Sequence, residues 1–231
     1  MTMTFPGFDA GIGLTGDANA QAAHALPRRK GLYRNFFKRV FDVTAIVMAA
    51  PVVVPVVAAL AVMVARDGGK PFYSQMRVGK GGKRFRMWKL RSMVCDADER
   101  MDDYLAAHPE ARLEWDLTQK LKDDPRITRV GKILRQTSLD ELPQLWNVLI
   151  GEMSLVGPRP IMLSQQSIYP GVAYYLLRPG CTGYWQTAGR NRTTFEARAG
   201  YDTAYEETLS LTTDLKILVN TVGVMMKGTG C

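Results

Sequence analysis

The sequence predicts a helix-rich α/β fold with a small β-hairpin and an N-terminal membrane segment that bends back on itself. Three observations lead to this expectation: an uncharged apolar run at 43–65, two short alternating segments around the glycine-rich turn at 79–82, and charged amphipathic stretches after residue 96. The length of 231 residues allows one folded domain plus an accessory segment. A composition of 46% hydrophobic and 23% charged residues argues against wholesale disorder and against a polytopic membrane protein.

We expect the chain to divide into three parts. Residues 1–30 form a flexible tail, because Gly, Ala, Thr and Asp recur there without a sustained period. Residues 31–67 form an interfacial and re-entrant membrane helix, since the basic and aromatic mixture at 30–41 is typical of a helix that lies on anionic headgroups. Residues 68–231 form the folded domain, which we expect on the cytoplasmic side of the membrane.

The apolar run at 43–65 is long enough to cross a bilayer, because a helix of that length extends ~35 Å. It begins too far along the chain for a secretory signal. Pro51 and Pro55 remove backbone donors in its middle, and Pro51 is the expected helix break. Lys and Arg flank both ends, and the positive-inside rule then places both ends in the cytoplasm. We expect a re-entrant helix-break-helix that enters one leaflet, although the residues alone leave a kinked single span open.

Positive charge is concentrated in one block of the chain. The net charge is +8, but residues 28–91 hold fifteen Lys and Arg side chains against only Asp42 and Asp67. Such a block could face nucleic acid, anionic lipid or a phosphorylated small molecule. The three cysteines form no CxxC pair and the chain has two histidines, so neither a disulfide scaffold nor a Cys/His zinc site fits.

The remaining elements follow from periodicity. The alternating segments at 72–78 and 84–90 predict two strands of a basic hairpin. Residues 96–122 predict amphipathic helices with a break near His108 and Pro109. Further helices are expected at 130–134, at 140–150, and, as one or two helices, at 199–226.

Asp140 and Glu141 are adjacent carboxylates that we expect at the start of a helix. Ser138 and Glu141 have the spacing of a capping box, and acidic residues are common at helix starts, so the pair taken alone favours a structural role. The functional alternative is that one carboxylate attacks phosphorus as a nucleophile while its neighbour holds Mg²⁺. Arg135 precedes the pair by five residues, and Arg159 lies between Pro158 and Pro160, which fix its backbone. Arginines bind phosphate oxygens in a bidentate manner, so this set suits a diphosphate.

The segment from Asp124 to Pro160 (DPRITRVGKILRQTSLDELPQLWNVLIGEMSLVGPRP) resembles the signature of the bacterial sugar transferases, the monotopic phosphoglycosyl transferases. The resemblance covers about residues 36 to 226. Its other motifs are Lys38-Arg39 with Phe41-Asp42, Phe72-Tyr73 with Gln75, Arg77-Val78-Gly79, 89–93 (KLRSM), 178–183 (RPGCTG), Trp185-Gln186, Gly189-Arg190, Asp202 with Tyr205, and Ser210 with 214–217 (DLKI).

The resemblance implies a function. An enzyme of this kind moves a hexose-1-phosphate from a UDP-sugar, with glucose and galactose both open, to undecaprenyl phosphate. Asp140 would form a phosphosugar-aspartate with release of UMP, and Glu141 would hold Mg²⁺. Lys89, Arg91, Arg135 and Arg159 would contact phosphate or nucleotide. The reaction would be the first membrane step of exopolysaccharide or related glycan assembly, and the domain at 68–231 would be catalytic.

The resemblance also implies a place in the cell and a set of partners. The protein would be monotopic on the cytoplasmic face of the bacterial inner membrane, in contact with membrane lipids and not with nucleic acid. Downstream glycosyltransferases and a second copy of the chain are further partners that the sequence leaves open. The alternative from another class is a membrane-anchored binding or scaffold protein, which would need no Mg²⁺ but would leave the Asp140–Glu141 pair without a role.

Overall fold

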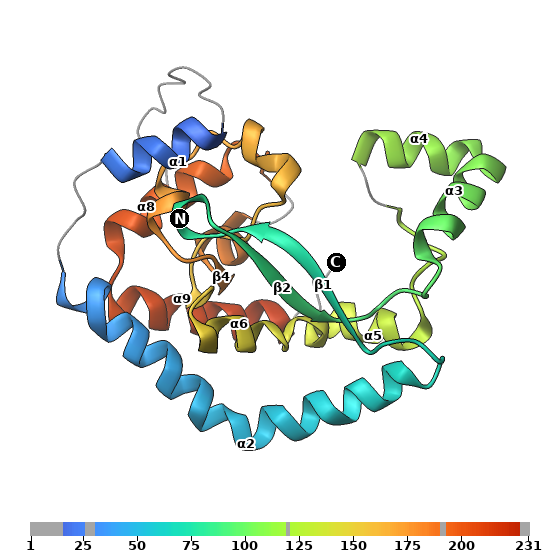
Figure 1. The fold of residues 1–231 in the computed structure, drawn as a ribbon, viewed down its shortest axis with the longest axis horizontal. Coiled ribbons are helices and arrows are strands. Elements are labelled where there is room, and N and C mark those ends of the chain that lie inside the picture. The colour runs from blue at the N-terminus through green and yellow to red at the C-terminus, as the bar shows by residue number, and fades with distance from the viewer. Residues whose placement is uncertain (1–15, 26–30, 119–120, 190–192, 227–231) are drawn as a thin grey trace.

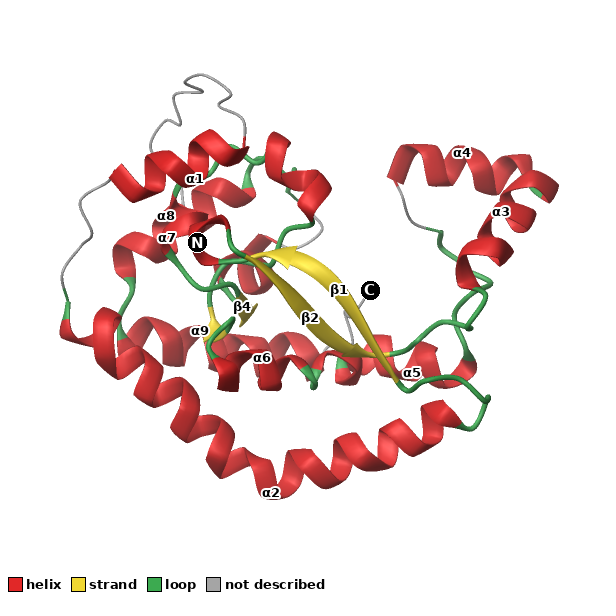
Figure 2. Cartoon of the chain, viewed as in Figure 1, coloured by secondary structure: helices red, strands yellow, loops and turns green. Residues whose placement is uncertain are grey.

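The computed structural model describes residues 16–25, 31–118, 121–189 and 193–226, and helices dominate it (Figures 1 and 2). The longer helices are α1 (Gly16–Ala25), α2 (Lys38–Ala65), α3 (Ala97–Ala107), α4 (Pro109–Thr118), α5 (Arg129–Thr137), α6 (Gln144–Ile150), α8 (Arg198–Thr208) and α9 (Leu211–Met226), with one short helix, α7 (Ala173–Leu176). Short turns of other helix types are η1 (Tyr33–Phe37), η2 (Lys80–Gly82), η3 (Leu139–Glu141), η4 (Leu163–Ile168) and η5 (Trp185–Gly189). The strands are β1 (Phe72–Val78), β2 (Arg84–Leu90), β3 (Ser154–Val156) and β4 (Gly180–Thr182).

Helix α2 is continuous through Pro51 and Pro55. The helix therefore bends where a break was expected. Figure 1 shows α2 as a V, with both of its ends directed toward the rest of the protein. A proline leaves the carbonyl four residues earlier without its usual donor, which lets the helix bend and does not require it to end. Ile46 and Val64 are the apolar side chains of α2 that the domain buries.

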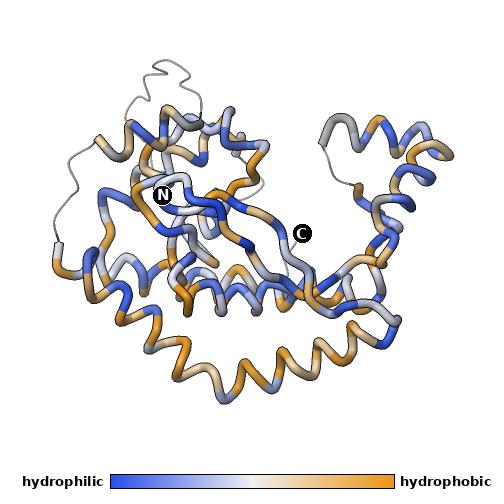
Figure 3. Tube along the Cα trace, in the orientation of Figure 1, coloured by the Kyte–Doolittle hydropathy of each residue, from blue (hydrophilic) through white to orange (hydrophobic). Residues whose placement is uncertain are grey.

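Most of α2 lies outside the protein core. Several of its large apolar side chains are strongly exposed, namely Val47, Met48, Val52, Val54 and Val62, and Figure 3 shows the helix as a nearly continuous hydrophobic tube. The helical run Tyr33–Ala65 is long and apolar enough to cross a membrane, and 11% of its most apolar window is buried. A core helix of a soluble domain would bury far more of this surface.

The β-hairpin has the predicted bounds. β1 and β2 pair antiparallel from Phe72 opposite Leu90 to Val78 opposite Arg84, and η2 closes the turn with Gly81 and Gly82 at positive φ. A second sheet was not predicted: β3 and β4 pair in parallel over three residues each. Strands of this length show too little alternation to be detected in a sequence.

The charged region after residue 96 forms helices α3 and α4, and the chain changes direction at His108 as predicted. Figure 1 shows this pair set apart from the other helices. The C-terminal region forms two helices, α8 and α9, within the predicted range. Helix α5 is longer than the predicted 130–134, because Thr128 caps its N-terminus by accepting a hydrogen bond from the Gly131 N–H at 2.8 Å.

The expectation of a flexible tail fails for residues 16–25, which form α1. Ala20 and Ala23 of α1 are buried against a cluster that includes Val78, Ile161 and Tyr169, and Asn19 Nδ2 donates a hydrogen bond to the Tyr169 carbonyl at 2.9 Å. An apolar face made only of alanine gives weak periodicity, which explains the missed prediction. The rest of the expected tail lies outside the described residues.

The docking of α1 can be tested by placing a charge on its buried face. Ala23→Asp puts a carboxylate against apolar side chains, where its desolvation opposes docking. We expect amide hydrogens of residues 16–25 to exchange at least about tenfold faster, which corresponds to about 1.4 kcal/mol of docking free energy. Gln21→Asp adds the same charge on the exposed face and should leave exchange close to that of the unaltered chain. Equal exchange in both variants would contradict the packing of α1.

A buried ionic network joins the start of α2 to the domain. Lys38 Nζ lies 2.8 Å from Asp214 Oδ2 on α9 and 3.4 Å from Asp42 Oδ1. Asp42 Oδ2 accepts a hydrogen bond from Ser154 Oγ at 2.7 Å, and Asp214 accepts bonds from Tyr33 and Tyr205 at 2.6 and 2.7 Å. The network fixes the N-terminal limb of α2 to β3 and α9.

Candidate active site

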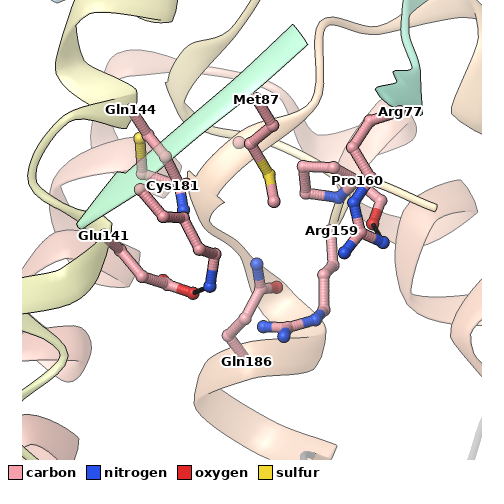
Figure 4. A pocket seen from close by; sticks show the side chains of 10 residues that line it. Arg77, Met87, Glu141, Gln144, Arg159, Pro160, Cys181 and Gln186 are labelled. Atoms are coloured by element: carbon pink, nitrogen blue, oxygen red, sulfur yellow. Dashed lines mark hydrogen bonds and ion pairs between the residues drawn. The ribbon is translucent and has the colours of Figure 1, made fainter. Parts of the chain in front are cut away.

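A polar hollow lies where the end of β2, the turn η3, the strand β4 and the turn η5 meet (Figure 4). Its lining combines cations, one carboxylate and neutral polar groups: Arg77, Met87, Lys89, Glu141, Gln144, Arg159, Pro160, Gly180, Cys181 and Gln186. The set includes four of the residues proposed from the sequence, Lys89, Glu141, Arg159 and Pro160, although they are up to 71 positions apart.

Asp140 and Glu141 lie on the turn η3 rather than at the start of a helix. Helix α5 ends at Thr137, Ser138 takes a left-handed conformation with φ 56°, and α6 begins only at Gln144. Ser138 makes no side-chain cap at η3, so the capping-box interpretation of the acid pair is wrong. The left-handed residue reverses the chain and places both carboxylates toward β2.

Lys89 of β2 bridges the two carboxylates. Its Nζ lies 2.7 Å from Glu141 Oε1 and 3.5 Å from Asp140 Oδ2. Burial raises the pKa of Glu141, but Lys89, Arg159 and the hydrogen bond from Gln144 together outweigh burial and lower it. Burial also raises the pKa of Asp140, and Lys89 offsets this only in part. Glu141 is thus held as a carboxylate, while Asp140 is more basic than an ordinary aspartate.

Arg159 faces Glu141 from the other side of the hollow, as Figure 4 shows. Its backbone is fixed between Pro158, whose carbonyl accepts a hydrogen bond from the Gly180 N–H at 2.8 Å, and Pro160. The close packing of β3 on β4 requires glycine at 157, because a Cβ there would lie 2.3 Å from the Arg178 carbonyl oxygen. The guanidinium of Arg159 lies 5.7 Å from the centre of the Trp185 ring.

Arg77 is a cation of this site that the sequence prediction left without a role. Its Nη2 donates to Gln75 Oε1 at 2.6 Å, and its Nη1 is 3.5 Å from the Pro160 carbonyl oxygen. Burial and the charge of Arg159 both lower the pKa of Arg77. Neither Arg77 nor Arg159 forms an ion pair within the described ranges, so their charges face the hollow without a carboxylate partner. Two unneutralised guanidinium groups are suited to an anionic ligand.

Two of the proposed phosphate contacts lie elsewhere. Arg91 forms an ion pair with Asp67 and donates to the Val64 carbonyl, so it joins the hairpin to the end of α2 and does not line the hollow. Arg135 donates from Nε to Ser92 Oγ at 2.9 Å, and its charge acts on Asp140 from outside the hollow.

Three neutral residues of the hollow were also missed as site residues: Gln144, Cys181 and Gln186. Cys181 and Gln186 lie close together on β4 and η5, but Gln144 lies on α6, 37 positions before Cys181, so no local spacing connects all three. Arg77 had a usable signal, because strand alternation and the hairpin register place residues 73, 75 and 77 on the face that carries Met87 and Lys89. Burial raises the pKa of Cys181 to about 12, which excludes this thiol as the nucleophile near neutral pH.

Comparison with known proteins agrees with this geometry. Residues 33–228 match the family described as bacterial sugar transferase. The chain belongs to this family. The match spans the bent helix, the acid pair on η3 and the segment that contains Arg159, and α1 lies before its start.

Individual relatives of the family have informative names. The chain is 47% identical to a UDP-galactose-lipid carrier transferase of Erwinia amylovora and 46% identical to an undecaprenyl-phosphate galactose phosphotransferase of Salmonella typhimurium, over 84% of this chain and 41% of each relative. It therefore spans less than half the length of these two proteins. It is 39% identical to the exopolysaccharide production protein ExoY of Sinorhizobium fredii, over 88% of this chain and 93% of that relative.

The residues of the hollow fit a divalent cation only when a ligand completes the site. No cluster of three or more His, Cys, Asp or Glu side chains occurs among the residues that the structure describes. Asp140 and Glu141 are adjacent, and Mg²⁺ is commonly held by one or two carboxylates together with waters and substrate phosphates. The pair thus suits Mg²⁺ that arrives with a phosphorylated substrate.

Proposed function

We propose that this chain transfers a hexose-1-phosphate from a UDP-sugar to undecaprenyl phosphate, with release of UMP, as the first membrane step of exopolysaccharide or related glycan assembly. The observation that supports it most is one hollow in which Glu141 and Lys89 lie opposite Arg159 and Arg77, while Asp140 lies 3.5 Å from Lys89 beside the residues that line it. Such an arrangement has a nucleophile on one side and diphosphate-binding cations on the other.

The names of relatives support the substrate class. Two are named for galactose transfer to a lipid carrier, and a Caulobacter vibrioides relative, 39% identical over 80% of this chain, is named a UDP-glucose:undecaprenyl-phosphate glucose-1-phosphate transferase. Both sugars therefore remain candidates for the donor.

In the first step, an oxygen of Asp140 attacks the phosphorus that bears the sugar, a P–O bond to Asp140 forms, and the P–O bond to UMP breaks. Burial raises the pKa of Asp140 above its ordinary value, which strengthens its carboxylate as a nucleophile, whereas Lys89 and Arg159 lower the pKa of Glu141. Lys89 holds both carboxylates in place, and Arg159 and Arg77 neutralise the diphosphate. In the second step, an oxygen of polyprenyl phosphate attacks the same phosphorus and releases the Asp140 carboxylate.

Mg²⁺ would be held by Glu141 and Asp140 with substrate phosphate oxygens. When bound, it would neutralise charge that develops on the transferring phosphoryl group. The proposal includes this ion because two carboxylates beside a diphosphate repel it unless a cation intervenes.

We further propose that α2 is re-entrant and that the protein is monotopic on the cytoplasmic face of the bacterial inner membrane. The exposed apolar side chains of α2, the bend at its prolines and the basic residues on both sides support this placement. Trp146 and Ile150 of α6 and Val219 of α9 are also exposed and would add apolar contacts with lipid.

The function can be tested by the order of product release. With UDP-glucose or UDP-galactose alone, we expect a burst of UMP of at most one per active site, because the first step needs no lipid. A mass adduct of hexose phosphate should then lie on the peptide that contains Asp140 and should be released by hydroxylamine, since the bond is an acyl phosphate. Adding undecaprenyl phosphate should give ping-pong kinetics. Intersecting initial-rate patterns, with no burst of UMP and no adduct on Asp140, would indicate that the lipid phosphate attacks the UDP-sugar directly. Asp140 would then not be the nucleophile.

The topology can be tested by accessibility. Single cysteines at residue 25 and near the C-terminus should both react with a membrane-impermeant maleimide only from the cytoplasmic side. Labelling from opposite sides would contradict the re-entrant placement. Replacing Pro51 and Pro55 with Leu should restore two backbone donors, straighten α2 and favour a full span, which would move one of the two labels to the periplasmic side.

A further inference from the structure

The amide group of Gln186 is unpaired although it is buried. Neither its Nε2 nor its Oε1 has a hydrogen-bond partner in the part of the chain that the structure describes. A buried amide without partners loses its hydration and gains nothing in return, so each such group in a folded protein calls for an explanation. The proposed reaction assigns Gln186 no role.

The amide is directed into the hollow. Figure 4 shows it extending from η5 to a position between Glu141 and Arg159. It therefore lies between Glu141 and the cations proposed to bind the diphosphate.

Neighbouring residues hold Gln186 in this position without bonding to its amide. It lies on the π-helical turn η5, a type of turn that is frequent at functional sites. Its neighbour Trp185 is buried, donates from Nε1 to Thr193 Oγ1 at 2.8 Å, and lies under the guanidinium of Arg198 at 4.0 Å from the ring centre. A Cβ on Gly183 would lie 3.0 Å from Gln186 Oε1, so glycine there leaves room for the side chain.

The chemistry of an amide restricts what it can bind. It offers one donor group and one acceptor side by side and has no charge. A phosphate oxygen only accepts hydrogen bonds, so it would leave Oε1 unpaired, and Arg77 and Arg159 already suit that group. A sugar hydroxyl both donates and accepts, and in the proposed reaction the sugar is attached to the phosphorus that Asp140 attacks.

We propose that Gln186 is a specificity-determining residue that hydrogen-bonds to a hydroxyl group of the sugar in the donor substrate. The inference rests on the proposed function, because it assumes a UDP-sugar in the hollow. The uridine part of the UDP-sugar also both donates and accepts hydrogen bonds, through its uracil ring and its ribose hydroxyls. The experiment separates binding to the uridine from binding to the sugar.

The test compares Gln186→Leu with the unaltered full chain in membranes, using UDP-glucose, UDP-galactose and their analogues that each lack one hydroxyl. We expect kcat/KM of Gln186→Leu to fall on the order of tenfold or more with the preferred sugar. With the one analogue that lacks the contacted hydroxyl, the variant and the unaltered chain should have equal kcat/KM, because the hydrogen bond is already missing. Gln21→Leu makes the same change on the exposed face of α1 and should have no effect.

The possible outcomes distinguish a contact with the sugar from a contact with the uridine. An equal loss with every sugar and analogue, together with weaker inhibition by UMP, would assign Gln186 to the uridine and overturn the proposal. Unchanged kcat/KM with all sugars would overturn it as well. If the unaltered chain turns over none of the UDP-sugars, the proposed function is wrong, and this inference is wrong with it.

Folding of the variant is itself a readout. Because Gln186 has no partner within the described ranges, leucine leaves no protein atom unpaired, and the thermal midpoint should not fall. Gln186→Met provides a second apolar side chain of similar length and should give the same pattern of kcat/KM. A folded Gln186→Met with normal discrimination among the analogues would contradict the assignment.

Discussion

Asp140→Asn is expected to reduce sugar-phosphate transfer on the order of 10³-fold or more, because asparagine cannot form the acyl phosphate bond. The fold should survive, since burial already disfavours the ionised form of Asp140 and an amide has no charge to desolvate. Lys89 keeps its shorter contact, 2.7 Å to Glu141, so the site should stay ordered. The measurement is the rate of UMP release from UDP-glucose or UDP-galactose in the presence of undecaprenyl phosphate.

Matched variants distinguish loss of the nucleophile from loss of charge. Asp103→Asn makes the same change at an exposed position of α3 and should transfer at the normal rate. Glu141→Gln should lower the rate by less and raise the Mg²⁺ concentration required, because it removes a proposed metal ligand and leaves Asp140 in place. A preparation of Asp140→Asn free of unaltered enzyme that transferred at a normal rate would disprove the covalent mechanism.

The sequence predicted those parts of the structure that depend on local pattern. The hairpin was found with its bounds because β1 and β2 alternate and a glycine-rich turn separates them. The direction change at His108 followed from Pro109. Such signals need only neighbouring residues, so one sequence suffices to read them.

Other parts depend on contacts that are distant along the chain. Helix α1 was missed because alanine gives a weak apolar face, and it docks only because Val78 and Tyr169 meet beneath it. The parallel pairing of Ser154 with Gly180 has no local signal at all. At η3 a local pattern led to a wrong prediction. The Ser138–Glu141 spacing suits a capping box at a helix start, but Ser138 has a left-handed conformation that ends α5 and leads into a turn.

The site was predicted in part for the same reason. Adjacent acids and a Pro-Arg-Pro turn are visible in the sequence, and Lys89, Glu141 and Arg159 do meet in the hollow. Lys89 and Arg91 have the spacing of one strand face, but β2 ends at Leu90 and Arg91 turns to Asp67. Gln186 enters the site through the pairing of β3 with β4, which only the fold reveals.

The second large effect concerns the anchorage of the membrane helix. Lys38→Met is expected to lower the unfolding free energy by about 3–5 kcal/mol, because it leaves two buried carboxylates, Asp42 and Asp214, without their shared cation. For a chain of this size, that corresponds to a fall in thermal midpoint of roughly 6–20 °C. The measurement is thermal unfolding of the detergent-solubilised protein.

The effect should be specific to the buried network. Lys132→Met removes the same charge from an exposed position of α5 and should shift the midpoint by no more than about 2 °C. The hydrogen bonds from Tyr33, Ser154 and Tyr205 to the two carboxylates persist in Lys38→Met, but they supply no positive charge. A midpoint equal to that of Lys132→Met would mean that desolvation of Lys38 cancels its attraction to Asp42 and Asp214. In that case the N-terminal limb of α2 would be anchored by the bond from Ser154 to Asp42 and by the bonds from Arg39 to two carbonyls of α6. The packing of Ile46 against Phe85 and Met153 would add to this anchorage.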